Sequence, residues 1–217
     1  MPNLVGPLPP HARLNNFLPE DDHRRVLDWV LSNPDAFSPA VVSDSDAGAK
    51  YEVSPEDRTA LTSKSLGPFE PMLRAHLLAA VDEIVASVGV PLSPESLDLE
   101  FSAYGDGAFF APHSDISTGR NRRPIGGQPG HDRILSAVYY FHREPKAFSG
   151  GMLRLYRFGA TPAADPAAAN YVDLEPVNNS LVAFWSPVLH EVRPVRCPTA
   201  KFEDSRFALN CWYCRPL

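Results

Sequence analysis

The sequence predicts an α+β fold, with two helices in the first half followed by a double-layer jelly roll, or double-stranded β-helix. Three observations support this prediction. First, 23 of the 217 residues are proline, roughly twice the usual share, and proline interrupts long helices and central strands. Second, apolar residues recur with a helical period before Gly89 and with a period of two after it. Third, turn-forming residues separate about eight short β-rich runs in the second half.

The composition fits a single globular domain, which we expect to cover residues 1–217. Hydrophobic residues make up 44% of the chain and charged residues 21%, a balance suited to a buried core under a polar surface. We expect N-terminal supporting helices in about residues 1–90 and the catalytic jelly roll in about residues 95–217. The net charge of −6 gives no reason to expect a nucleic-acid partner, because phosphate binding relies on clustered Lys and Arg.

The cysteines and the hydropathy pattern indicate the cellular compartment of the protein. Cys197, Cys211 and Cys214 cannot all pair within one chain, so a reducing compartment fits better than an extracellular one. The segment from Met1 to Leu14 has no basic start followed by an apolar run, and no stretch approaches ~18 consecutive apolar residues. We therefore expect a cytoplasmic protein with no membrane partner.

Two helices are predicted in the first half of the chain. Acidic residues after Pro19 suit the positive end of a helix dipole, and the apolar face that follows ends near Asn33. Apolar residues at helical spacing predict a second helix over about residues 69–88. Between them, the segment 37–66 is rich in Ser, Asp and Ala, which predicts a loop with at most one short strand or turn.

Alternating apolar and polar residues predict the strands of the second half. The predicted strands are Leu97–Tyr104, Phe109–His113, Ile134–Phe141, Met152–Tyr156, Tyr171–Leu174, Leu181–Trp185, His190–Val195 and Phe207–Tyr213. An Ala-, Pro- and Asp-rich stretch, Pro162–Asn170, predicts a surface loop. A closed double layer is favoured because it hides most strand edges.

The triplet His113-Ser114-Asp115 contains two candidate metal ligands at the end of a predicted strand. Residues two apart on a strand point to the same side, so this imidazole and carboxylate can reach one ion. Alone, such a triplet arises often by chance and equally describes a surface turn. His190 at the start of a later strand adds a second imidazole. Two His and one Asp make the facial triad of non-haem Fe(II) oxygenases, which leaves three coordination positions open.

Arg206 begins the last predicted strand. A guanidinium that points into a mostly apolar barrel is costly unless it is paired with an anion, and its planar fork suits a carboxylate. The alternative is an exposed arginine at a strand end.

In order and together, four segments resemble the Fe(II)- and 2-oxoglutarate-dependent dioxygenases, and most closely the prolyl hydroxylase branch. The segments are Tyr104-Gly105-Asp106-Gly107 leading to His113-Ser114-Asp115, Ile134–Phe141 followed by Ser149-Gly150-Gly151-Met152-Leu153-Arg154, Phe184-Trp185 leading to His190–Val195, and Arg206–Tyr213. The resemblance runs from about Leu99 to Tyr213, a little over half of the chain.

The resemblance implies roles for particular residues. The implied iron ligands are His113, Asp115 and His190. Arg206 would bind the distal carboxylate of 2-oxoglutarate, Tyr140 matches a position whose hydroxyl reaches that carboxylate, and Tyr104 matches a tyrosine beside the cosubstrate. Adjacent strand residues face opposite ways, so Tyr139 is the second choice for the inward position. Lys201 is a rival to Arg206, since some family members use a lysine closer to the distal histidine.

Two features are candidates for substrate binding. Trp212 lies six residues after Arg206, hence on the same strand face, and could wall a substrate pocket or equally be a core aromatic. The basic, Gly-containing segment 117–127 is a candidate lid, in which Arg120, Arg122 or Arg123 would meet polar or acidic groups of the substrate. A solvated loop is the alternative for this segment.

The resemblance implies an enzyme that hydroxylates an unactivated C–H bond, using Fe(II), 2-oxoglutarate and O₂, releasing succinate and CO₂, with ascorbate as a candidate reductant. A prolyl or other amino-acid residue in a protein or peptide is the first expectation for the substrate, and a free amino acid or small natural product is the alternative. An alkylated-nucleobase demethylase is disfavoured, because Trp212 stands where that group has a second arginine. A non-catalytic jelly-roll binding module is the alternative of another class.

Overall fold

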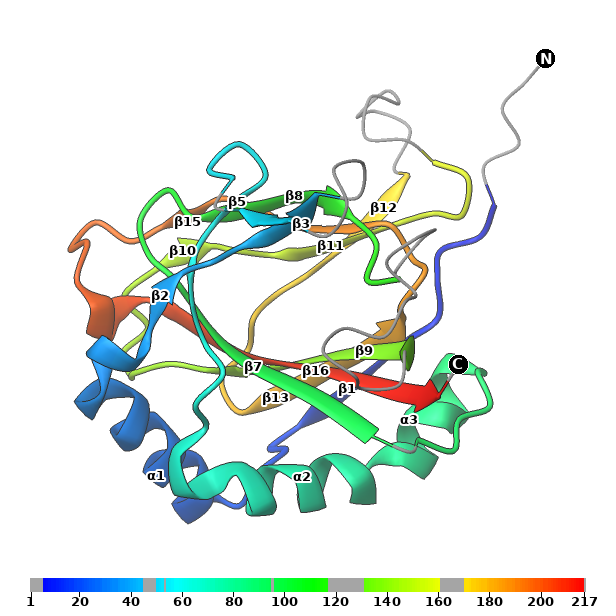
Figure 1. The fold of residues 1–217 in the computed structure, drawn as a ribbon, viewed down its shortest axis with the longest axis horizontal. Helices are drawn as coiled ribbons and strands as arrows, with labels where there is room; N and C mark the ends of the chain where they lie inside the picture. Colours follow the sequence, from blue (N-terminus) through cyan, green and yellow to red (C-terminus); the bar gives the residue numbers. More distant parts are fainter. Residues whose placement is uncertain are drawn as a thin grey trace.

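The computed structural model describes residues 6–44, 50–52, 54–94, 96–116, 131–160 and 170–216. Two antiparallel sheets face each other (Figure 1). The larger sheet has the order β1 (His11–Asn15), β13 (Ser180–Trp185), β9 (His131–Phe141), β16 (Arg206–Pro216), β7 (Ser96–Tyr104), β6 (Leu61–Ser63) and β2 (Ser38–Pro39). The smaller sheet has the order β12 (Tyr171–Leu174), β11 (Leu153–Tyr156), β14 (His190–Val192), β8 (Phe109–His113) and β5 (Arg58–Thr59).

Helices cover the outer face of the seven-stranded sheet. In Figure 1, α1 (Glu20–Ser32), α2 (Glu70–Ala79) and α3 (Val81–Val88) lie below that sheet, on the side away from the five-stranded one. The helix predicted over about residues 69–88 is in fact two consecutive helices, because the chain leaves the regular helical path at Ala80, where φ is −82° and ψ is −5°. Within the described residues, none of the helices combines the length and apolar character needed to cross a membrane.

Strand alternation sorts the side chains of the large sheet into two sets. One set, which includes Leu99 and Phe101 of β7, packs with the helices in the main hydrophobic cluster. The other set points between the sheets, where Tyr140, Val182 and Ala208 form a second cluster with residues of the five-stranded sheet. The site described below lies in this space between the sheets.

The first half of the chain contributes more strands than the sequence predicted. The prediction of at most one strand over residues 37–66 is wrong, because this segment holds β2, β3 (Val42–Asp44), β4 (Lys50–Glu52), β5 and β6. Strands of two or three residues are too short to show a period. The N-terminal strand β1 was not predicted either. It extends the large sheet by pairing with β13, with His11 opposite Phe184 at one end and Asn15 opposite Ser180 at the other.

The predicted strand His190–Val195 is divided into β14 and β15 (Val195–Arg196), and β15 pairs with β10 (Ser149–Gly150) in a separate two-stranded sheet. Pro194 lies at the break, and a proline has no N–H to donate to a strand ladder. The other predicted strands of the second half agree with the structure to within a few residues at each end.

Candidate active site

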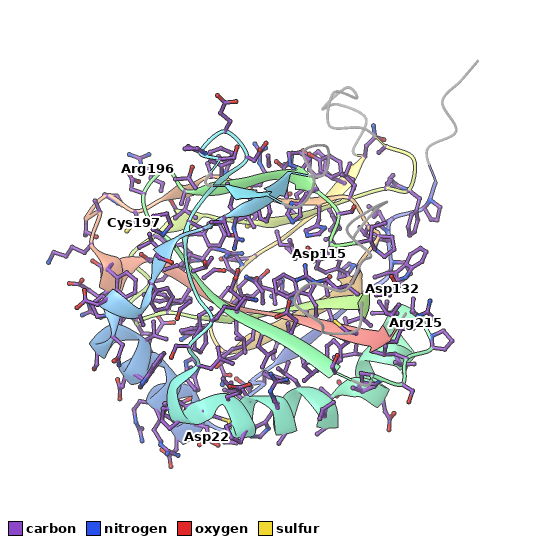
Figure 2. All side chains as sticks on the ribbon, viewed as in Figure 1. Asp22, Asp115, Asp132, Arg196, Cys197 and Arg215 are labelled. Carbon is purple, nitrogen blue, oxygen red and sulfur yellow. The ribbon has the colours of Figure 1, made fainter. Side chains whose placement is uncertain are left out.

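Three candidate metal-binding side chains meet between the two sheets. His113 ends β8, His190 begins β14, and the two residues are opposite each other in the pairing of these strands. Nε2 of His113 lies 3.7 Å from Oδ1 of Asp115, and Nε2 of His190 lies 3.5 Å from Oδ2. The three ligand atoms lie within 4.8 Å of one another, and the described residues contain no second group of this kind. Figure 2 shows Asp115 in the space between the sheets.

Hydrogen bonds orient each of these side chains. In both His113 and His190, Nδ1 lies 2.8 Å from the backbone carbonyl oxygen of the residue two positions earlier. Because a carbonyl oxygen only accepts, Nδ1 carries the proton in the neutral form of both rings, and this tautomer presents the Nε2 lone pair to a metal ion. The Ser136 hydroxyl donates to Oδ2 of Asp115 over 2.6 Å. Two imidazole lone pairs and one carboxylate are the donor set that suits Fe(II).

The surroundings favour the protonation states that metal binding needs. Burial, together with the neighbouring His190, lowers the pKa of His113, so its imidazole stays neutral. Burial alone would raise the pKa of Asp115, but His190, His113 and the hydrogen bond from Ser136 outweigh burial and lower it. A neutral imidazole and an ionised carboxylate are the metal-binding forms of these groups.

A buried arginine lies in the same cavity as the three ligands. Arg206 is 1% exposed, and its guanidinium lies 5.0 Å from the ring centroid of Tyr104 and 4.8 Å from that of Tyr140. Nε of Arg206 and the hydroxyl of Tyr140 have no hydrogen-bond partner among the described residues, and no described carboxylate pairs with Arg206. A buried cation without an anion is strongly unfavourable. These groups therefore fit a bound carboxylate, which would pair with the guanidinium and accept from the hydroxyl.

Gly151 allows Arg206 to occupy this position. The backbone of Gly151 has a φ of +65°, and a Cβ atom there would lie 2.7 Å from Cδ of Arg206. A larger residue at position 151 would force the side chain of Arg206 to shift. The glycines of the predicted Ser149–Arg154 segment thus have a physical reason to be there.

The cavity that contains both groups has a volume of about 40 Å³. All the described residues that the sequence predicted for the site line this cavity: His113, Asp115, His190, Arg206, Tyr140, Tyr104 and Trp212. The predicted lid with Arg120, Arg122 and Arg123 lies outside the described residues.

The second choices from the sequence lie elsewhere. Tyr139 points to the helix side of the sheet, where its hydroxyl lies 2.6 Å from Nδ1 of His23. Lys201 is exposed and lines a separate cavity of about 390 Å³, together with residues such as Pro39 and Phe202. Neither residue is brought to the cavity that contains Arg206.

The cavity wall also includes residues that sequence reasoning did not single out, among them Arg58, Phe110 and Asn210. Arg58 is 8% exposed, and its Nη2 lies 3.2 Å from the Ser102 hydroxyl and 3.4 Å from a carboxylate oxygen of Glu100. It comes from the two-residue strand β5, which carries no sequence signal. Phe110 and Asn210 lie on strands that were predicted, but an aromatic or an amide alone does not indicate a site.

The fold and this group of residues define a jelly-roll enzyme of the non-haem iron class. Residues 99–214 match the sequence model of the 2OG-Fe(II) oxygenase superfamily. The chain belongs to this superfamily, whose members use Fe(II), 2-oxoglutarate and O₂. The predicted family, enzyme class and cofactors are therefore confirmed, while the roles of individual residues stay predictions.

One curated protein of similar sequence is named a hydroxylase. An uncharacterized PKHD-type hydroxylase from Synechocystis sp. is 26% identical over 204 residues, which cover 93% of this chain and 62% of that protein. The chain thus spans less than two thirds of this relative.

Two solved structures show the same fold. A prolyl-4-hydroxylase from Pseudomonas putida has a TM-score of 0.59 and 24% identity, covering 95% of this chain and 92% of that one. A prolyl hydroxylase from Trichoplax adhaerens, in complex with a hypoxia inducible factor oxygen degradation domain peptide fragment, has a TM-score of 0.60 and 20% identity, covering 94% and 82%. The jelly-roll prediction is confirmed, and the fold is prolyl hydroxylase-like.

Proposed function

We propose that the protein hydroxylates an unactivated C–H bond of a prolyl or other amino-acid residue in a protein or peptide, and converts 2-oxoglutarate and O₂ to succinate and CO₂. The observation that carries the proposal is the buried, unpaired Arg206 beside Tyr140, in one cavity with a His-Asp-His group. The choice of substrate is supported by two similar structures that are named prolyl hydroxylases, one of them in complex with a peptide.

The metal-binding group supplies three protein ligands. His113 and His190 would bind the iron through Nε2, and Asp115 through a carboxylate oxygen, so three positions stay open for 2-oxoglutarate and O₂. Iron and 2-oxoglutarate together supply the oxidising power that cleaves the C–H bond. The carboxylate at position 115 favours hydroxylation, because a small residue there would open a further coordination position, as in the related halogenases.

The remaining residues of the site orient and enclose the cosubstrate. Arg206 would pair with its distal carboxylate, and Tyr140 would donate a hydrogen bond to the same group. Burial raises the pKa of Tyr140, although Arg206 and Arg13 oppose this effect, so the hydroxyl keeps its proton and can donate. The apolar cluster around Tyr140, which includes Leu153, keeps water away from this end of the cavity.

An anaerobic titration tests the site. Metal-free protein is titrated with Fe(II) and 2-oxoglutarate, and the visible metal-to-ligand charge-transfer band is followed. We expect a band in the wild type, no band in His113→Ala, and a band that needs far more 2-oxoglutarate in Arg206→Gln. Arg24→Gln, which removes an exposed arginine of α1, serves as the control and should behave like the wild type. Absence of the band in folded wild-type protein would favour the non-catalytic binding module.

A second experiment tests the substrate class. Proline-containing peptides, free amino acids and small natural products are compared by succinate release and by the gain of one oxygen atom in the product. We expect turnover with peptides. Turnover with a free amino acid or natural product alone would replace the peptide in the proposal and leave the oxygenase chemistry intact.

A further inference from the structure

We propose that Arg58 is a positioning residue of the iron centre, which holds the ring of Phe110 against the metal ligand His113. The inference rests on the proposed function in that it takes His113 as an iron ligand. Arg58 lies in β5, far outside the segment 99–214 that matches the superfamily, yet it forms part of the cavity wall. Its side chain connects the two sheets beside the metal-binding group.

The strand that carries His113 is irregular just before this residue. Between the pairs His190–His113 and Val192–Phe110, β8 has one residue more than β14, which makes a β-bulge. In a regular strand, residues 110 and 113 would face opposite sides. With the extra residue, both side chains line the cavity, and their rings stack at 3.6 Å. Pro112 lies in the irregular stretch and has no N–H to donate. The backbone ladder therefore restrains His113 weakly, and side-chain contacts gain importance.

Arg58 supports Phe110 from the neighbouring strand. The two residues are opposite each other in the pairing of β5 with β8, and the guanidinium of Arg58 lies 4.8 Å from the centroid of the Phe110 ring. A cation at this distance from an aromatic ring is attracted to it. Because β5 has only two residues, backbone pairing alone would hold the arginine in place weakly.

The guanidinium of Arg58 is anchored on the large sheet. Its Nη2 donates to the Ser102 hydroxyl of β7 over 3.2 Å and lies 3.4 Å from a carboxylate oxygen of Glu100 on the same strand. Ser102 is fully buried and also accepts from Nδ2 of Asn210 on β16 over 2.6 Å. These contacts connect the edge of the small sheet to two strands of the large one. Arg58 thus links Phe110 to a fixed point on the large sheet.

Stability alone gives a weak reason for an arginine at this position. Arg58 is 8% exposed, and its Nε has no hydrogen-bond partner among the described residues. Burial removes the hydration of the guanidinium, and an ion pair as long as the 3.4 Å contact with Glu100 recovers only part of that cost. An apolar residue would avoid the cost, but only a planar cation can both lie against Phe110 and donate to Ser102. These features fit a role in holding the site.

The test is a double-mutant cycle on metal binding. Fe(II) affinity is measured without 2-oxoglutarate, by competition with a chromophoric chelator under anaerobic conditions, in the wild type, Arg58→Lys, Phe110→Leu and the double variant. Lysine keeps the charge but lacks the planar fork. Loss of support around a ligand predicts about tenfold weaker binding in Arg58→Lys. Because Arg58 acts through Phe110, the same substitution in the Phe110→Leu background should change the affinity less than about twofold.

Arg74→Lys is the matched control. Arg74 also bonds to a carboxylate, that of Glu70, and to a strand of the large sheet through the carbonyl oxygen of Leu97, but it lies outside the cavity lining. This variant should bind Fe(II) like the wild type. A lower free energy of unfolding in metal-free Arg58→Lys, with unchanged Fe(II) affinity, would show a structural role and overturn the inference. An equal affinity loss in both backgrounds would also overturn it, since Arg58 would then act by a route other than Phe110.

The outcomes separate this inference from the proposed function. If His113→Ala abolishes Fe(II) binding and Arg58→Lys leaves it unchanged, the role of Arg58 is overturned and the proposed function stands. Failure of the folded wild type to bind Fe(II) would overturn both. If Arg58→Lys does not fold, Ser102→Ala removes the hydroxyl that anchors the guanidinium. A loss of Fe(II) affinity in Ser102→Ala that disappears in the Phe110→Leu background supports the inference, and no loss overturns it.

Discussion

The ring of Phe110 stacks on the ring of His113, with 3.6 Å between the ring centroids and 17° between the planes. The guanidinium of Arg58 lies 4.8 Å from the centroid of Phe110, so Phe110 has a cation as well as an imidazole beside it. The His113 ring is therefore restrained by stacking as well as by the hydrogen bond at its Nδ1.

Replacing Phe110 is expected to weaken metal binding. In Phe110→Leu the imidazole of His113 gains freedom, and loss of such support around a ligand typically lowers metal affinity about tenfold or more. Competition with a chromophoric chelator under anaerobic conditions measures the Fe(II) affinity. Phe158→Leu, which changes an aromatic residue that packs on Trp185, is the control. Equal affinity in both variants would mean that stacking on His113 contributes nothing.

Gly151→Ala is expected to be more damaging than Gly89→Ala. Both glycines have a positive φ, +65° and +73°, so both substitutions carry a backbone penalty of about 1–2 kcal/mol. A Cβ at position 151 would also lie 2.7 Å from Cδ of Arg206, whereas nothing lies within 4 Å of one at position 89. Gly89→Ala should therefore lose stability alone, while Gly151→Ala should also bind 2-oxoglutarate more weakly. Denaturant unfolding and calorimetry distinguish the two effects, and identical behaviour of the variants would argue against displacement of Arg206.

Trp212 is expected to contact the substrate. It lines the cavity, and the guanidinium of Arg133 lies 3.8 Å from its ring centroid. With an active peptide in hand, Trp212→Ala should raise the KM for the peptide about tenfold, the effect of removing a moderate aromatic contact. Binding of 2-oxoglutarate in the absence of peptide should not change. Trp185→Ala removes a more exposed tryptophan outside the cavity lining and should leave KM unaltered. A KM unchanged in Trp212→Ala, with a lower free energy of unfolding, would assign Trp212 to the core.

His23 is expected to make stability fall in mild acid. Burial lowers the pKa of His23, and His142 adds to this effect while Glu20 and Glu144 oppose it. In the unfolded chain a histidine takes up a proton near pH 6.5. The unfolded state then binds more protons than the folded state, so the stabilisation is complete above that pH and is lost as the pH falls.

The pH dependence of unfolding in denaturant tests this expectation. Between about pH 7.5 and pH 5, the free energy of unfolding of His23→Gln should fall less steeply than that of the wild type. Burial also lowers the pKa of His142, so His142→Gln should flatten the same curve, and the double variant should flatten it further. Parallel curves for His23→Gln and the wild type would rule out a contribution from His23.

The sequence located the metal-binding group because its residues lie at the ends of strongly patterned strands. His113 closes a strand whose bounds were predicted as observed, and His190 opens another. Alternation alone left Tyr139 and Tyr140 as alternatives, since it says that they face opposite ways but not which way. Contacts with distant parts of the chain decide the matter, because Tyr139 meets His23 of α1 while Tyr140 meets Arg206.

The positions of the arginine side chains in the first half of the chain could not be predicted in the same way. Arg58 and Arg13 lie on β5 and β1, of two and five residues, which are too short to show a period. Their positions depend on pairing with β8 and β13, far away in sequence. The division between α2 and α3 could not be predicted, because the helical spacing of the apolar residues continues across Ala80.

The place of β16 in the large sheet has a consequence for biosynthesis. This strand is the last along the chain, yet it lies between β9 and β7 rather than at an edge. Until the ribosome has released Arg206–Pro216, the two halves of the sheet have no strand to join them, and the apolar faces of the helices have no complete surface to cover. The sheet therefore assembles only after this segment has been translated. A premature stop codon just before Arg206 would remove the strand that joins β9 to β7, and the truncated chain would have an unpaired edge on each of these two strands.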